Sequence, residues 1–249
     1  MEQMLNVSSN PHVRDKMTTG RIMQLVVLAL LPTTLFGIWN FGFRAFLVVL
    51  VTVASSVFFE WLYDRLMHKK NTVTDFSAAV TGLLLALNMP PQIPLWMPVL
   101  GSAFAIIVVK QLFGGLGQNF MNPALAARCF LMISFTGKMT DFAVDKLSGY
   151  HCIDTVTGAT ALAELKNSGF TADSISVKNL FIGNIHGTIG ETSALAILIG
   201  AVILLAFKVI DLKIPLTYIG SFAVFVIFYM LGTGKGFDVN YLFSHLFGG

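Results

Sequence analysis

Seven apolar runs are the feature that most restricts how this chain can fold. A helix needs about 20 apolar residues to cross a bilayer, and most of these runs approach that length. Charged residues make up only 12% of the chain, whereas soluble domains carry about 25%. The sequence therefore predicts an all-α polytopic membrane protein with about seven transmembrane helices and one long extracytoplasmic insert. The runs cover residues 22–39, 45–63, 76–89, a fourth run that ends at 112, 124–135, 192–209 and 214–231.

These runs divide the chain into four parts. The predicted parts are a cytoplasmic leader (1–20), transmembrane helices one to five (21–135), a polar insert (136–190), and helices six and seven with a C-terminal tail (191–249). The third run, Phe76–Met89, is short for a straight crossing. It is followed by Pro90, Pro91, Pro94 and Pro98. Short, proline-interrupted segments often mark binding sites inside membrane proteins.

The distribution of Lys and Arg predicts the orientation, because positively charged connections stay in the cytoplasm. With a cytoplasmic N-terminus, the outer turns keep only Arg44 and Lys235. The insert follows five spans, so it is predicted on the outer side of the cytoplasmic (inner) membrane. The residues then placed inside are Arg14, Lys16, Arg21, Arg65, Lys69, Lys70, Lys110, Lys208 and Lys213.

The polar insert contains a compact motif, D-x-x-T-G-A-T, formed by residues 154–160. Gly158 lets the backbone come close to a bulky ligand, and Ala159 leaves space beside Thr160. Helix-forming residues follow, so the Thr160 hydroxyl lies near a helix start that favours phosphate. It could bind a phosphate or carry one as an ester. The alternative is an ordinary helix N-cap, although no Glu or Gln completes a capping box.

A second motif, Gly114–Pro123, reads GGLGQNFMNP. It contains Gly115, Gly117, Asn119 and Asn122, but it has neither a dinucleotide fingerprint nor the Lys of a P-loop. At membrane depth, such a segment indicates either a broken helix that lines a cavity or a packing turn between two spans. Residue chemistry leaves both readings open.

One cation, Arg128, lies inside the fifth apolar run. An intramembrane cation is functional or paired by default, and the alternative is a snorkelling side chain near a helix end. The five His residues show no zinc spacing, and no catalytic nucleophile–base pair can be assigned. Cys129 and Cys152 are expected to be separate thiols. The net charge of +3 indicates no nucleic-acid surface.

Four segments together resemble the RnfD/NqrB family of membrane subunits. They are the D-x-x-T-G-A-T motif, the G-G-x-G-x-N-x-x-N-P stretch, Thr74–Pro91 and the G-E-T-S segment at Gly190. The resemblance implies that Thr160 is esterified to the phosphate of FMN by a flavin transferase that uses FAD and Mg²⁺. Asp154, Thr157, Gly158 and Ala159 would then serve as the recognition motif.

The same resemblance implies a flavin pocket among the spans, with a non-covalent riboflavin as its candidate ligand. Gly115, Gly117, Asn119, Asn122 and Arg128 are the candidate pocket residues. Two carboxylates at span ends, Asp75 and Glu191, are expected to be helix caps, with an ion path or the flavin pocket as the alternatives.

The short leader resembles RnfD more than NqrB, which carries a longer N-terminal extension. The resemblance therefore implies an electron-relay subunit of a redox-driven, ion-translocating ferredoxin:NAD⁺ oxidoreductase (Rnf) complex, with subunits A, B, C, E and G as partners. The alternatives are an NqrB-type subunit of a Na⁺-translocating NADH:quinone oxidoreductase and a non-redox secondary transporter. Members of the family continue with further spans, so we expect these 249 residues to be an incomplete or unusually short version.

Overall fold

The computed structural model describes residues 17–69, 72–142, 181–183, 187–232 and 239–247. Within these ranges the protein is helical and contains no strand. The predicted all-α class is therefore confirmed for the described part of the chain. The motif residues Asp154, Thr157, Gly158, Ala159 and Thr160 lie outside the described residues.

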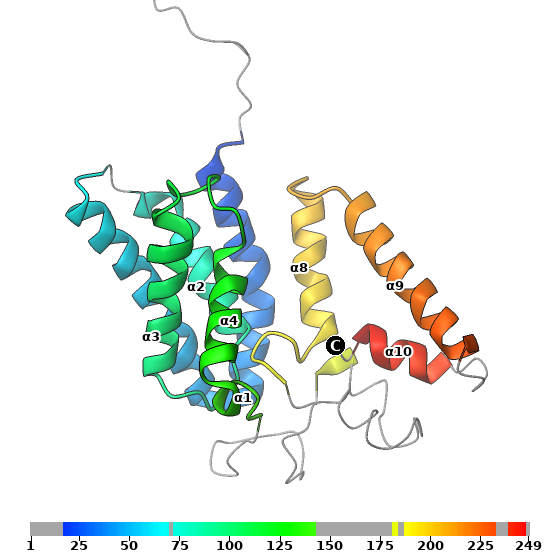
Figure 1. Ribbon diagram of the computed structural model, residues 1–249. Coiled ribbons are helices and arrows are strands. Elements are labelled where there is room, and N and C mark those ends of the chain that lie inside the picture. The colour runs from blue at the N-terminus through cyan, green and yellow to red at the C-terminus, as the bar shows by residue number, and fades with distance from the viewer. Residues whose placement is uncertain (1–16, 70–71, 143–180, 184–186, 233–238, 248–249) are drawn as a thin grey trace, which may run out of the picture.

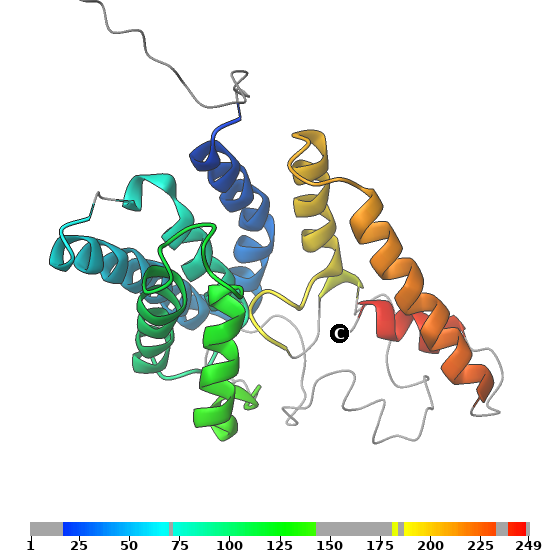
Figure 2. The same ribbon diagram turned by 45° about the horizontal axis from the view of Figure 1, so that its top comes forward.

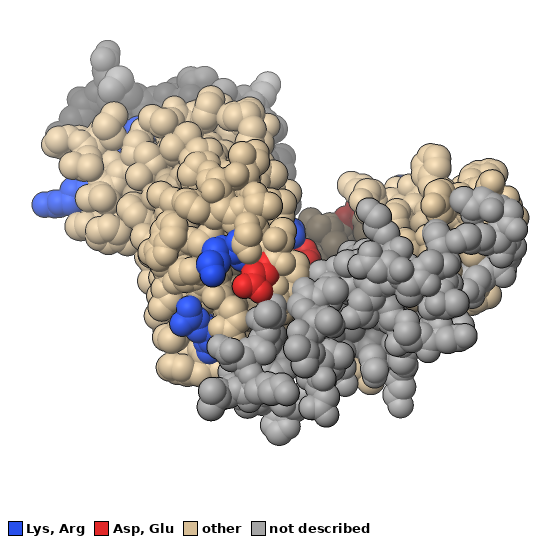
Figure 3. All heavy atoms as spheres, turned by 60° about the horizontal axis from the view of Figure 1, so that its bottom comes forward, with Lys and Arg blue, Asp and Glu red and all other residues tan. Residues whose placement is uncertain are grey.

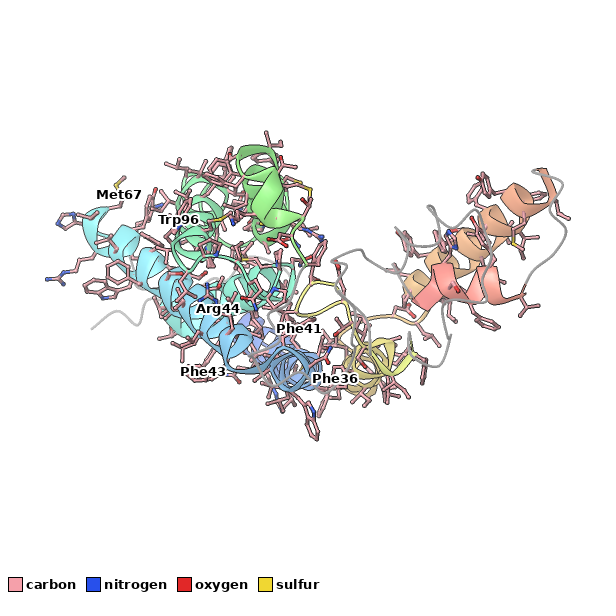
Figure 4. All side chains as sticks on the ribbon, turned by 90° about the horizontal axis from the view of Figure 1, so that it is seen from below. Phe36, Phe41, Phe43, Arg44, Met67 and Trp96 are labelled. Carbon is pink, nitrogen blue, oxygen red and sulfur yellow. The ribbon has the colours of Figure 1, made fainter. Side chains whose placement is uncertain are left out.

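The first two apolar runs form α1, Thr19–Leu66, which consists of two helical arms joined at a bend. Gly42 at the bend has φ 73° and ψ −162°, a conformation that glycine adopts easily and other residues avoid. The bend lies in the turn that the sequence predicts between the two runs. In Figure 1, α1 starts at the upper end of the bundle and bends at the lower end. Figure 4 labels Phe41, Phe43 and Arg44 beside the bend.

The third and fourth runs form shorter elements that pack against α1. A 3₁₀ turn, η1 (Val73–Asp75), leads into α2 (Ser77–Leu87). The proline-rich connection then leads to α3 (Trp96–Ala103), which continues as a π-helix, η2 (Phe104–Gln111). In the connection, Ile93 is buried, and its carbonyl accepts a hydrogen bond from Arg44 Nη2 at 3.2 Å.

The remaining described elements are α4 (Pro123–Ser134), α5 (Thr136–Met139), α8 (Ala194–Ala206), α9 (Lys213–Gly232) and α10 (Val239–Phe247). Figures 1 and 2 show that α4 ends at the lower end of the bundle and that α8 starts there. The segment that the sequence assigns to a tail thus contains a short helix. The turn α5 extends helical structure beyond the predicted end of the fifth span.

The core lies where α1, α2, α3 and α4 meet. It contains Phe41, Leu85, Met97, Ala127 and Leu131, all at most 1% exposed. Glycines allow the closest approaches between helices. A Cβ on Gly82 of α2 would lie 2.8 Å from Ser56 Oγ and 2.9 Å from Val53 Cα of α1. Likewise, a Cβ on Gly200 would lie 2.3 Å from the backbone oxygen of Ala29, so α8 packs directly on α1.

Large apolar side chains cover the outer surface of these helices, as expected for a protein surrounded by lipid. Among the described residues, Thr19–Leu66 and Lys213–Gly232 are long and apolar enough to cross a membrane. Four shorter apolar helices accompany them: Ser77–Leu87, Trp96–Gln111, Pro123–Ser134 and Ala194–Ala206. Each of the seven predicted runs contains a helical segment. By length and composition alone, the two longest helices qualify as candidate membrane spans.

We predict that Gly82→Ala destabilises the protein by about 1–3 kcal/mol, because the added methyl group overpacks the α1–α2 contact. Gly220→Ala is the matched control. A Cβ on Gly220 has no neighbour within 4 Å, and alanine is the better helix former. Thermal unfolding of the purified protein in detergent measures both effects. Equal melting temperatures for the two variants would contradict the close packing at Gly82.

Candidate functional site

The short helix α2 begins at an unusual backbone position. Phe76, just before the helix, has φ 63°, in the left-handed region. Asp75 Oδ1 accepts a hydrogen bond from the backbone N–H of Ser77 at 2.8 Å, and it also accepts one from the Ser77 hydroxyl. Asp75 therefore caps the start of α2, which confirms the capping role predicted for it.

The other end of α2 lies inside the bundle, where residues 188–191 pair with it. Backbone N–H groups of Ile189 and Gly190 donate to the carbonyls of Met89 and Leu87 at 3.1 and 2.8 Å. A Cβ on Gly190 would lie 2.7 Å from Leu87 Cβ, so only glycine fits there. The segment before α8 thus satisfies carbonyls that a broken helix would leave unpaired.

Arg128 on α4 lies beside this broken end. Its Nη1 donates to Asn88 Oδ1 at 2.7 Å and to Glu191 Oε1 at 3.2 Å. Arg128 is therefore paired. The capping role predicted for Glu191 is wrong, because Ser193 caps α8 by accepting from the N–H of Ala196. Figure 3 shows basic and acidic side chains gathered on this lower face.

A cavity of about 330 Å³ lies at the opposite, upper part of α2, between α1, α2, η2 and the loop 112–122. Its volume falls within the range of about 300–1,000 Å³ that small-molecule sites occupy. Most of the wall is apolar. The polar lining residues are Ser77, Thr81, Lys110, Asn119 and Asn122.

Three glycines shape the loop that covers this cavity. Gly114, Gly115 and Gly117 have φ values of 113°, 92° and 86°, which residues with a side chain rarely adopt. The N–H of Gly115 donates to the Lys110 carbonyl at 3.0 Å. Gly115 and Gly117 do not line the cavity, whereas Leu116 between them does. The glycines therefore act by turning the backbone.

Asn122 serves the helix that follows the loop. Its Oδ1 accepts from the N–H groups of Ala124 and Leu125 at 3.0 and 3.4 Å, and Pro123 occupies the first helical position. This is a regular N-cap followed by proline. Asn122 thus fixes the start of α4 at the edge of the cavity.

Asn119 of the loop has a buried polar atom without a hydrogen-bond partner among the described residues. Its Nδ2 donates to the Met121 carbonyl at 3.2 Å. Its Oδ1 is buried and has no hydrogen-bond partner among the described residues. A buried acceptor without a partner costs about 1–3 kcal/mol. Since Asn119 lines the cavity while its Oδ1 is out of reach of water, a ligand could accept a hydrogen bond from this oxygen's amide or donate to the oxygen only after the Asn119 side chain rotates.

A buried ion pair forms part of the same wall. Lys110 Nζ donates to Glu60 Oε1 and Oε2 at 2.8 and 2.9 Å, and to Ser77 Oγ at 2.6 Å. Gln111 Nε2 donates to Glu60 Oε1 at 3.2 Å. The Lys110 and Glu60 side chains are 2% and 0% exposed. The sequence analysis counts Lys110 among the charges on the cytoplasmic side. The structure places its side chain in the protein interior, in η2, and not in a solvent-exposed connection.

The ion pair extends to a second carboxylate. Thr72 Oγ1 lies 2.6 Å from Glu60 Oε1 and 2.9 Å from Asp64 Oδ2, and the Thr72 N–H donates to the same Asp64 oxygen at 2.8 Å. Glu60 and Asp64 are functional candidates that sequence reasoning missed. A signal was present: Thr52, Ser56 and Glu60 recur every fourth residue of the second apolar run, and Asp64 continues the series just after it, which places all four on one helix face.

Of the predicted pocket residues, Asn119 and Asn122 lie together at this cavity. Gly115 and Gly117 shape its cover, and Arg128 lies at the other end of α2. No cluster of three or more His, Cys, Asp or Glu residues among the described residues could hold a metal ion.

Comparison with known proteins gives a consistent result. The model of the "NQR2, RnfD, RnfE family" matches residues 6–249. The D subunit of the Na⁺-translocating ferredoxin:NAD⁺ oxidoreductase complex of Acetobacterium woodii is 48% identical over 91% of this chain and 70% of its own length. The D subunit of the proton-translocating complex from Clostridium ljungdahlii is 37% identical over 90% of this chain and 69% of its own length. The B subunit of the Na⁺-translocating NADH-quinone reductase of Stutzerimonas stutzeri is 31% identical over 94% of this chain and 67% of its own length.

We predict that Lys110→Met destabilises the protein by about 3–5 kcal/mol, because it leaves the Glu60 carboxylate buried without a cation. The double variant Lys110→Met/Glu60→Leu should recover much of this loss. Arg128→Met, which breaks a half-exposed pair, should cost about 0–1 kcal/mol. Thermal unfolding in detergent compares the three. Equal losses of stability in Lys110→Met and Arg128→Met would contradict the burial of the Lys110–Glu60 pair.

Proposed function

Because the chain belongs to the NQR2, RnfD, RnfE family, we propose that it relays electrons through flavin within an ion-translocating ferredoxin:NAD⁺ oxidoreductase complex. The observation that carries the proposal is the 48% identity, over 91% of the chain, to a relative named as the D subunit of such a complex. The relative named as an NADH-quinone reductase subunit is 31% identical. That subunit type is therefore the second candidate.

The covalent flavin of this proposal is FMN on Thr160. The sequence D-T-V-T-G-A-T supports it, because a hydroxyl follows a glycine and an alanine that leave space for a bulky donor. A separate transferase would join the Thr160 oxygen to the flavin-side phosphorus of FAD. The pyrophosphate bond breaks, AMP leaves, and the hydroxyl proton passes to a base or to solvent.

The cavity beside Asn119 is the proposed place for a second, non-covalent flavin. Its volume and the apolar part of its wall suit a flat heteroaromatic ring, and the amide of Asn119 in the lining can meet a polar ring edge once that side chain rotates. Lys110, the cation in its wall, is already paired with Glu60. The residues therefore favour riboflavin, which has no phosphate, over FMN. A bound flavin supplies reversible uptake and release of electrons and protons.

The proposed topology has seven membrane passes, with the N-terminus inside and the insert outside. The two arms of α1 each exceed about 20 residues, the length of a membrane crossing. In Figure 1, α1 starts at the upper end, while α4 ends and α8 starts at the lower end. This arrangement supports an insert on the side opposite to the N-terminus, in a multi-pass protein of the cytoplasmic membrane.

Partners follow from the same assignment. The relatives are named as subunits of ion-translocating complexes, so we expect subunits A, B, C, E and G beside this chain, and a flavin transferase during maturation. A non-redox transporter with its substrate at the 112–122 loop is the rival from another class. Visible absorbance of the purified protein separates the two, because a transporter would carry no flavin.

We predict that wild-type protein, co-expressed with a flavin transferase, gives a fluorescent band on a denaturing gel, and that Thr160→Ala does not. Alanine removes the attacking oxygen, and a lost helix cap would cost only on the order of 1 kcal/mol. The protein should therefore still accumulate. Thr160→Ser and Thr171→Ala are the controls that should keep fluorescence. A band in Thr160→Ala would exclude Thr160 as the attachment site.

We also predict that a cysteine at position 168 reacts with an impermeant thiol reagent in intact cells. The test uses Ser168→Cys in a chain whose Cys129 and Cys152 are replaced by serine. Ser9→Cys in the leader is the matched control, and it should react only after the cells are opened. The reverse pattern would show that the insert faces the cytoplasm.

A further inference from the structure

The buried polar groups at the upper end of the bundle form a continuous series that ends in the cavity. Thr72, at the outer end, is half-buried and reaches the surface. Its hydroxyl contacts Glu60, Glu60 is bound by Lys110, and Lys110 donates to Ser77. Every link is between 2.6 and 2.9 Å.

The inner end of the series is open to the cavity. Lys110 and Ser77 both line it, together with Asn119. At the outer end, Asp64 lies beside Thr72 and is 3% exposed. Asp64 Oδ1 has no hydrogen-bond partner among the described residues. Thr72, which is half-buried, is therefore the member of the series that a proton from the surface can reach.

We propose that these residues are a proton relay between the upper surface of the protein and the cavity. Each member can hold or accept a proton: the carboxylates of Asp64 and Glu60, the hydroxyls of Thr72 and Ser77, and the ammonium group of Lys110. The inference rests on the proposed function in one respect, namely that a flavin in the cavity exchanges the protons.

Thr72 lies between the two carboxylates of the series. Its single hydroxyl proton lies between oxygens of two carboxylates, at 2.6 Å from Glu60 and 2.9 Å from Asp64. The hydroxyl can donate to either oxygen by a small rotation about its C–O bond. Thr72 therefore joins two carboxylates of α1, and a proton that arrives at one of them can pass to the other through this hydroxyl.

The net charge of the network is the same before and after a complete transfer. A proton that enters at Thr72 moves to Glu60, Lys110 passes a proton to the cavity, and Glu60 returns one to Lys110. One proton enters and one leaves. The charged groups that face this path are Glu60 and Asp64 of α1, Asp75 of η1 and Lys110 of η2.

The test measures proton release from the cavity flavin in the full-length chain, in a Thr160→Ala background that removes the covalent flavin. The flavin is reduced chemically, the excess reductant is removed, and ferricyanide then oxidises the flavin. Ferricyanide takes one electron per molecule and no proton, so two electrons leave the reduced flavin and its protons pass to solvent. A pH-indicator dye in weak buffer follows their release.

Thr72→Val removes the hydroxyl and keeps the shape of the side chain. We expect it to slow proton release about a hundredfold, the lower range of what a positioned proton-transfer group contributes, with the number of protons unchanged. Thr72→Ser should restore the rate. Thr52→Val is the matched control, because Thr52 is a buried threonine of α1 whose hydroxyl donates to the Val48 carbonyl, outside the series.

An unchanged rate in Thr72→Val would overturn the relay, because protons would then reach the flavin through the mouth of the cavity. Equal slowing in Thr72→Val and Thr52→Val would also overturn it, since the effect would be structural. If the Thr160→Ala protein releases no flavin on denaturation, the proposed occupant of the cavity is wrong, and the relay is wrong with it. This last result is recognised before any rate is measured.

Discussion

The ion pair between Lys110 and Glu60 is the constraint on which the rest of the upper bundle depends. Moving either charge out of water is costly, and the pair is tolerated only when further hydrogen bonds satisfy both groups. Ser77 and Gln111 supply these bonds, at 2.6 and 3.2 Å. Three elements must therefore meet in one register: the second arm of α1, the start of α2 and the end of η2. A shift of one residue in any of these elements would leave a charged group inside the bundle without its partner.

The helix that carries Lys110 is adapted to this requirement. In η2 the backbone bonds span five residues, as from Leu112 N to the Ile107 carbonyl at 3.0 Å. Such a wide turn is rare and often found at functional sites. Three successive residues, Val109, Lys110 and Gln111, are all buried here. The polar ends of Lys110 and Gln111 thus both reach Glu60, and the glycine loop that follows returns the chain across the cavity.

Apolar patterning predicted the helices better than it predicted the site. The seven runs coincide with helical segments because lipid-facing and core-facing residues are both apolar, so composition alone marks them. The turn at Gly42, the short α2 and the cap at Asp75 were also visible in local residue chemistry. The polar network was not, because its central contact joins Glu60 and Lys110 across 50 positions of sequence. Likewise, Glu191 was misread as a cap because its partner Arg128 lies on another helix. Local sequence patterns identify helix ends, whereas contacts between helices determine the role of a charged residue near such an end.

The shortness of α2 changes the electrical properties of this part of the molecule. Its 11 residues span about 16 Å at 1.5 Å per residue, roughly half of the 30 Å hydrocarbon layer of a bilayer. Polar groups lie at both of its ends, with Ser77, Lys110 and Asn119 above and Asn88, Arg128 and Glu191 below. Wherever water reaches both sets of polar groups in an energised membrane, most of the transmembrane voltage falls across the apolar layer between them. The local field is stronger than in the surrounding lipid, and a charge displaced along α2 senses a larger share of the voltage per ångström.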